Sequence, residues 1–172
     1  AENSNVGASI NSTSTTFRVG DDAQNRQARA ILSFNTSSIP DDAVIVSAML
    51  KIRRSTVVGT DPFTTHGVLQ MDINQGGYNG DAILEAADFQ APSTQAAVTT
   101  FNRINVMQWH NAVLKSAYFA VFNLTGMTQV RVRFSIDDNN DNGADYRLFC
   151  SGDSANKPVW WITYYVPAPD AD

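Results

Sequence analysis

Apolar and polar residues alternate at every second position along several stretches of the chain. This two-residue period is typical of β-strands that bury one face and leave the other in solvent. The alternation begins at Thr16 and returns over 30–34, 44–53, 129–136 and 158–166. Within 44–53 the pattern places on one face Val44, Val46, Ala48, Leu50 and Ile52.

Short clusters of Gly, Asp, Asn and Pro separate these stretches and indicate turns, among them 20–22, 39–42 and 137–143. Helical signals are limited to 81–89, where Asp81 could cap the first turn, and to 114–122. Many short strands with little helix predict an all-β protein, an antiparallel jelly-roll β-sandwich with one or two short helices. The expected organisation is an N-terminal extended arm (1–13), a single β-sandwich domain (14–166) and a C-terminal tail (167–172).

Composition and charge restrict the function classes. The 172 residues suffice for one domain with a sizeable core, and only 17% of them are charged. The net charge of −5 argues against a general nucleic-acid binder, because neutralising phosphates requires a basic surface. No apolar run approaches the ~20 residues of a membrane span. The sequence also lacks a nucleophile–histidine motif, a zinc spacing and a phosphate loop, so we expect no enzyme and no catalytic residues.

Several features are typical of an exported protein. The chain begins Ala1-Glu2-Asn3, which looks like a mature N-terminus left by a signal peptidase. The composition is rich in Ser, Thr and Asn and poor in Lys, and the single Cys150 is expected to be buried and inert. We therefore expect an extracellular or cell-surface location, with the signal peptide removed. Triplets for N-glycosylation occur at Asn11, Asn35 and Asn123.

The acidic segment 137–145 is a candidate calcium site. Asp137, Asn139 and Asp141 occupy alternate positions, and Asp145 could complete the shell of oxygen ligands that Ca²⁺ requires. The glutamate that ends an EF-hand loop is missing. The alternative is a plain turn between strands, in which Asn, Asp and Gly adopt left-handed conformations. The pair Asp21-Asp22 is a weaker cluster with the same alternative.

Trp161 and Tyr165 are candidate ligand-contacting aromatics. The alternation in the last strand puts them on the face opposite Trp160, Ile162 and Tyr164. An outer aromatic face can stack on sugar rings, form a protein interface, or be covered by another segment of the same chain. Two further residues that could share such an outer face, or pair with Asp or Thr across strands, are Arg131 and Arg133.

The two histidines have ordinary structural interpretations. Beside His110, Trp109 is expected in the core, with the histidine exposed. His66 stands at a strand entry, where a turn or hydrogen-bonding role is expected rather than a ligand role.

The polar N-terminal arm is a candidate assembly element. A short β-like piece within it contains Asn5, Val6, Ala8 and Ile10. Such a piece can add a strand to a sheet edge of the same chain or of a neighbour. A head-to-tail contact of this kind that does not close produces a fibre.

Residues 29–52 contain a strand, the Ile39-Pro40 turn and a second strand with Ala48 and Leu50 inward. Residues 149–164 contain Pro158-Val-Trp-Trp-Ile162. These two stretches resemble DNRLRE-type domains, which are grouped with carbohydrate-binding modules related to disaggregatase. The resemblance covers roughly residues 14–166 and implies a secreted jelly roll without catalytic residues. It transfers no glycan-binding residue, because the family has no strict motif for them.

Two functions follow as predictions. The first is a structural subunit of an extracellular assembly, such as a filament, sheath or surface layer, in which the arm adds to a neighbour. The alternative is a carbohydrate-binding or adhesive module that recognises extracellular polysaccharide. The expected partners are therefore other copies of the chain and polysaccharide, and the only expected cofactor is the calcium of segment 137–145.

Overall fold

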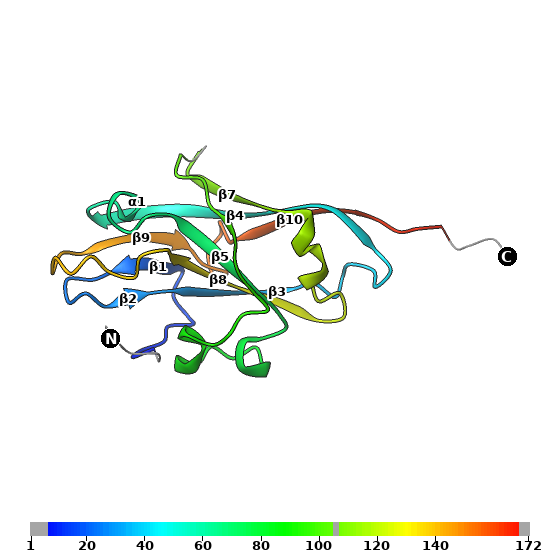
Figure 1. The fold of residues 1–172 in the computed structure, drawn as a ribbon, viewed down its shortest axis with the longest axis horizontal. Helices are drawn as coiled ribbons and strands as arrows, with labels where there is room; N and C mark the ends of the chain where they lie inside the picture. Colours follow the sequence, from blue (N-terminus) through cyan, green and yellow to red (C-terminus); the bar gives the residue numbers. More distant parts are fainter. Residues whose placement is uncertain (1–6, 105–106, 169–172) are drawn as a thin grey trace.

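The protein is a β-sandwich in the computed structural model, which describes residues 7–104 and 107–168. Its strands form two antiparallel sheets that pack face to face (Figure 1). The strands are β1 (Thr16–Asp21), β2 (Gln27–Ala28), β3 (Ala30–Asn35), β4 (Val44–Gly59), β5 (Leu69–Gln75), β6 (Gln95–Thr100), β7 (Trp109–Leu114), β8 (Met127–Phe134), β9 (Asp145–Cys150) and β10 (Val159–Tyr165). The helices are α1 (Pro62–Thr65) and three 3₁₀ turns, η1 (Tyr78–Gly80), η2 (Ala86–Phe89) and η3 (Ser116–Val121).

The strand order is that of a jelly roll. One sheet runs β7-β4-β9-β1-β2, with β10 as an additional partner of β4, and the other runs β3-β8-β5-β6. Successive strands therefore alternate between the sheets along much of the chain, as the two Greek keys of a jelly roll require. The predicted all-β sandwich is confirmed.

Strand β4 is the longest strand and pairs along both edges. Strand β7 follows one edge, from Arg53 opposite Trp109 to Ala48 opposite Leu114. The other edge carries β9 and then β10, which pair with the second and the first half of β4 respectively. In Figure 1 β10 and the start of β4 run together toward the right-hand end of the sandwich.

The core lies between the sheets and is built from the alternating positions of both. In β8 the residues Val130, Val132 and Phe134 are fully buried, as the alternation predicts. Aromatic rings fill one part of the core, where Phe134 meets Phe63 edge to face at a centroid distance of 5.2 Å. Such pairs add to the apolar area removed from water.

A β-bulge changes which residues of β4 face inward. Thr163 lies opposite Ser47, but the next residue of β10, Tyr164, lies opposite Ile45, so Val46 is an extra residue. Beyond this point Ile45 packs against the core, while Val44 and Val46 are exposed. The prediction that Val44 and Val46 share a face with Ala48 is therefore wrong, because a bulge reverses the alternation of the strand that contains it.

The predicted helices are shorter than expected. Only Ala86–Phe89 of 81–89 and Ser116–Val121 of 114–122 are helical, and both are 3₁₀. Asp81 instead accepts a hydrogen bond from the backbone N–H of Ile83 in a local turn. Helix α1 was not predicted from the sequence. Asp61 caps it, and it begins with Pro62, a residue favoured at the first helical position.

The last residue of β4, Gly59, lies close to the backbone of Ala144, and this contact generates a stability prediction. Gly59 has φ +69°, and a Cβ there would lie 1.4 Å from the carbonyl oxygen of Ala144. We expect Gly59→Ala to lower the free energy of unfolding by about 3 kcal/mol, the upper end of overpacking costs. Chemical denaturation measures this difference.

Gly152→Ala is the matched control, because a Cβ at Gly152 meets no atom within 4 Å. We expect it to change the free energy of unfolding by less than about 0.5 kcal/mol. Equal effects of the two substitutions would contradict the described contact between Gly59 and Ala144.

Candidate functional site

An apolar row crosses the outer face of the sheet that contains β4. Val113 of β7 lies opposite Met49 of β4, which lies opposite Trp161 of β10. The side chains of Trp161 and Val113 are 58% and 62% exposed. The predicted outward position of Trp161 agrees with this placement.

Lys51 lies between two tryptophans on the same face. Its Nζ is 3.9 Å from the ring centroid of Trp161 and 5.5 Å from that of Trp109. Both distances are within the range of cation–π attraction. We call Trp161, Lys51, Trp109, Met49 and Val113 the aromatic platform.

The expected roles of Trp109 and His110 are reversed. Trp109 is half-buried and belongs to the outer face, whereas His110 is fully buried in the core. His110 is satisfied there: Nδ1 donates to the carbonyl of Asn102 at 2.6 Å, and Nε2 accepts from Arg147 at 2.9 Å. Burial lowers the pKa of His110 below its ordinary value, and the charge of Arg147 adds to this, so the ring is neutral near pH 7.

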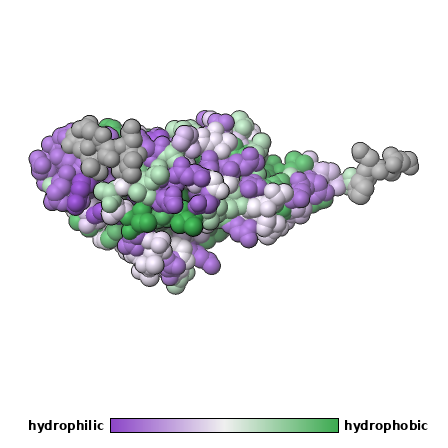
Figure 2. Space-filling model, turned by 90° about the horizontal axis from the view of Figure 1, so that it is seen from below, coloured by the Kyte–Doolittle hydropathy of each residue, from purple (hydrophilic) through white to green (hydrophobic). Residues whose placement is uncertain are grey.

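The far end of the same sheet exposes further apolar side chains. Val44, Val46, Tyr165 and Val166 all lie on or beside the β4–β10 ribbon and are exposed. Figure 2 shows green atoms toward this narrowing end of the molecule. The outer edge of β10 pairs with no strand among the described residues. Tyr165 thus lies on an exposed surface, as predicted.

Arg131 and Arg133 lie on the other sheet, away from this surface. Arg131 is 6% exposed, and both side chains bind the buried carboxylate of Asp72, with N–O distances of 2.9 Å. Arg131 also donates to the carbonyl of Ala91 at 2.8 Å. Of the two predicted placements, cross-strand pairing with Asp is the one observed, since Asp72 lies opposite Arg131 in the β5–β8 register. The outer face shared with Trp161 is wrong, because segment 78–93 covers this face of the sheet and Arg131 anchors that segment.

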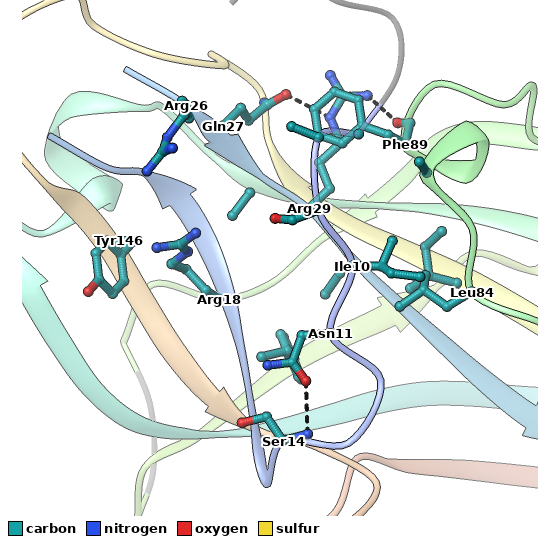
Figure 3. Close-up of a pocket in the computed structure, with 18 of the residues that line it drawn as sticks. Ile10, Asn11, Ser14, Arg18, Arg26, Gln27, Arg29, Leu84, Phe89 and Tyr146 are labelled. Carbon is teal, nitrogen blue, oxygen red and sulfur yellow. Dashed lines mark hydrogen bonds between the residues drawn. The ribbon is translucent and has the colours of Figure 1, made fainter. Parts of the chain in front are cut away.

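The described part of the N-terminal arm lies on its own sandwich. The N–H of Gly7 donates to the carbonyl of Ala86 at 2.8 Å, and residues 7–15 form no strand. Ile10 and Asn11 line a pocket of about 450 Å³ beside β1 and β3 (Figure 3). Ala8 also lines it, whereas Asn5 and Val6 lie outside the described residues.

Three arginines line the pocket, and the guanidinium group of each contacts another side chain. Arg29 stacks on the ring of Phe89 at 4.2 Å and donates to the side chain of Gln27 at 2.7 Å. Burial, reinforced by the charges of Arg131 and Arg133, lowers the pKa of Arg29 to about 10. Arg26 pairs with Asp22, and Arg18 lies over Tyr146 (Figure 3).

The acidic segment 137–145 connects the two sheets, because β8 and β9 belong to different ones. The amide of Asn139 donates to Asp141 at 2.9 Å and to Asp145 at 3.1 Å. Asn139, Asp141 and Asp145 are therefore brought together, while Asp137 has an exposed side chain and no hydrogen bond to them. The amide oxygen of Asn139 accepts from the N–H of Asp141 at 3.4 Å, so these contacts form a hydrogen-bonded turn and the Ca²⁺ site stays a prediction.

Asp145 instead points into a different cluster. This cluster consists of the buried residues Asp21, His66 and Asp145. Each offers one potential metal-ligand atom that lies within 4.8 Å of the other two. Burial raises the pKa of Asp21 above its ordinary value; the charge of His66 opposes this and that of Asp145 adds to it. Asp21, His66 and Asp145 are each noted in the sequence, but they lie far apart in the chain and no motif indicates that they meet.

The remaining candidates are surface features. Asn11 and Asn35 are exposed, and Asn123 is half-buried, with its side-chain oxygen accepting from the backbone N–H of Thr125. Cys150 is half-buried rather than buried as expected.

Comparison with known proteins adds no family. Neither a scan against protein-family models nor a search of curated proteins gives a match to this sequence. The resemblance to DNRLRE-type domains therefore stays a prediction. Among the residues that the structure describes, no helix is both long and apolar enough to cross a membrane.

The Asp72 cluster generates a pH prediction. Burial opposes ionisation of Asp72, but hydrogen bonds from Arg133 and Ala97 and the nearby arginine charges outweigh it, so its pKa lies below the ordinary value. Its stabilisation is complete above the unfolded-state pKa of about 3.9 and is lost as pH falls through the folded-state pKa. Urea denaturation should show this decline between about pH 5 and pH 2, with pH 7 as the reference.

Asp72→Asn should lower stability at pH 7 by about 3–5 kcal/mol, because it leaves buried Arg131 without its carboxylate. The variant should also lose less stability than the wild type as pH falls. Asp41→Asn, at an exposed position, is the control and should behave as the wild type. If the stability of Asp72→Asn fell with pH as steeply as that of the wild type, the role assigned to the Asp72 carboxylate would be contradicted.

Proposed function

We propose that this protein is a non-catalytic, extracellular carbohydrate-binding module that holds polysaccharide on the aromatic platform. The observation that carries the proposal is the exposed Trp161 beside Lys51 on an open sheet face. A flat ring binds the apolar face of a sugar, while an ammonium group donates hydrogen bonds to its hydroxyls or pairs with a carboxylate. The jelly roll and the predicted exported location agree with this function.

The surroundings of Trp161 suit an extended ligand better than a small molecule. The platform follows a line across β7, β4 and β10, and Thr163 continues it along β10 as an exposed polar side chain. The face is open, whereas small-molecule sites are concave and bury most of the ligand. A polysaccharide chain could therefore lie across several strands with one sugar on Trp161.

Self-association is the second candidate, and the β4–β10 end favours it. Its outer edge offers backbone groups for strand addition, and the valines and tyrosine beside that edge offer apolar contact. The N-terminal arm gives less support to assembly than its sequence predicts, because the N–H of Gly7 donates to the carbonyl of Ala86 in the same chain. In this candidate, the structural-subunit function depends on β10 rather than on the arm.

Polysaccharide binding predicts a selective effect of Trp161→Ala. Removing the exposed ring should weaken binding by about tenfold or more and leave the free energy of unfolding within about 1 kcal/mol of the wild type. Affinity electrophoresis against neutral and acidic polysaccharides, followed by calorimetry on the best ligand, measures both affinities. The matched control is Ile83→Ala, since Ile83 is 67% exposed on the segment that covers the other sheet.

Two results would count against this function. One is no binding of the folded wild type to any polysaccharide in the panel. The other is equal binding by the wild type and Trp161→Ala, which would place the ligand elsewhere on the molecule.

Self-association predicts a mass above the 18.8 kDa of one chain that rises with protein concentration in light scattering. Tyr165→Lys should return the mass to that of the monomer, because it places a charge in the apolar end of the β4–β10 ribbon. Ile83→Lys is the control. A wild type that stays monomeric at all concentrations would contradict this candidate and leave polysaccharide binding untouched.

A further inference from the structure

Three segments of the sandwich bring potential metal ligands together at one buried point. Asp21 ends β1, His66 follows α1, and Asp145 begins β9. Their candidate ligand atoms lie within 4.8 Å of one another, and the three residues are at most 1% exposed. Asp21 and Asp145 are direct neighbours in the β1–β9 register, so the sheet itself fixes two of the three groups.

Two of the three candidate ligands, Asp21 and His66, carry buried polar atoms that lack the partners such atoms normally have. Both carboxylate oxygens of Asp21 and Nε2 of His66 make no hydrogen bond within the described structure. The closest approach is 3.3 Å between His66 Nε2 and Asp21 Oδ1. Buried polar groups without partners are rare and indicate an unseen water, ion or functional role. His110, by contrast, is just as buried and has a partner on each ring nitrogen.

The cluster also lacks a permanently charged cation. Within the described residues, neither Asp21 nor Asp145 forms an ion pair with Lys or Arg, and His66 pairs with Asp21 only when it is protonated. The nearby Arg147 is already bound to Asp61 in a two-point contact of 2.9 and 2.6 Å. Two buried carboxylates without a cation are unfavourable, and a proton or a bound metal ion resolves this.

We propose that Asp21, His66 and Asp145 bind a divalent transition-metal ion of the zinc type, which acts as a structural cross-link. A nitrogen and two carboxylate oxygens form a ligand set that suits Zn²⁺, whereas Ca²⁺ takes six to eight oxygens. Bonds of about 2.1 Å in a tetrahedron put neighbouring ligand atoms roughly 3.4 Å apart, close to the Nε2–Oδ1 separation. One position remains for water or a backbone oxygen.

The outer contacts of the ligands fit this assignment. Nδ1 of His66 lies 2.7 Å from the hydroxyl of Thr65, and a metal on Nε2 makes that nitrogen the donor. Asp145 accepts from the N–H of Thr60 at 3.0 Å and from Asn139 at 3.1 Å. The ligand side chains are thus oriented by Thr60, by Thr65 of α1 and by Asn139 of the acidic segment, as bound-metal ligands commonly are.

The first test is the metal content of the wild type. Because the ligands are buried, the protein is unfolded in denaturant with chelator and refolded with Zn²⁺, Mn²⁺, Ca²⁺ or no metal. After desalting, we expect about one equivalent of zinc by elemental analysis. We also expect the Tm to be about 5–10 °C higher than after metal-free refolding. No retained metal and a Tm unaffected by all three ions would overturn the proposal.

Variants then identify the site. His66→Gln and Asp21→Asn keep side-chain volume, and we expect both to lose the bound zinc and the zinc-dependent rise in Tm. Asp137→Asn, in the exposed part of the acidic segment, should keep both. Loss of metal in Asp137→Asn with retention in His66→Gln would overturn the proposal in favour of the loop. If neither cluster variant folds, the metal content of the wild type still decides, and polysaccharide binding is measured separately.

Discussion

The fold depends on the double pairing of β4. One edge of this strand binds β7, and the other edge binds β9 and β10 in succession, so a single strand sets the register of most of its sheet. A one-residue slip would turn the buried Ala48, Leu50 and Ile52 to solvent. The burial of this row therefore holds four strands in register at once.

The same strand explains why an exposed surface exists. β4 continues past the core, and the bulge opposite Thr163 and Tyr164 turns Ile45 inward while Val44 and Val46 turn out. Trp161 and Lys51 occupy the outer side of the part that does cover the core. The rigid centre of the sheet thus presents a platform, and its overhanging end presents a free edge. The two proposed functions, polysaccharide binding and self-association, would therefore use separate surfaces of the molecule.

The sequence predicts the features that the alternation within each strand determines. It misses those that depend on contacts with segments far away in the sequence. The strands and the sandwich follow from the two-residue period, which each segment carries on its own. That period does not say which face is inside: in β7, Trp109 and Val113 are outside, whereas His110 is inside because Arg147 and Asn102 satisfy it. The alternation placed Arg131 opposite the core correctly. It could not show that Asp72 and segment 78–93 bury this face as well.

Buried charge is handled in two different ways in the sheet that contains β9. Arg147 and Asp61 neutralise each other beside a neutral His110, so this set is complete without any further group. Asp21 and Asp145 lie at the end of the same sheet, and among the described residues only His66 is a potential cationic partner of this pair. A chain with a single cysteine forms no intramolecular disulfide. An ion that binds only the folded state would stabilise it by mass action, as a cross-link between β1, β9 and the segment after α1. The proposed metal would thus both balance this charge and stabilise the folded domain.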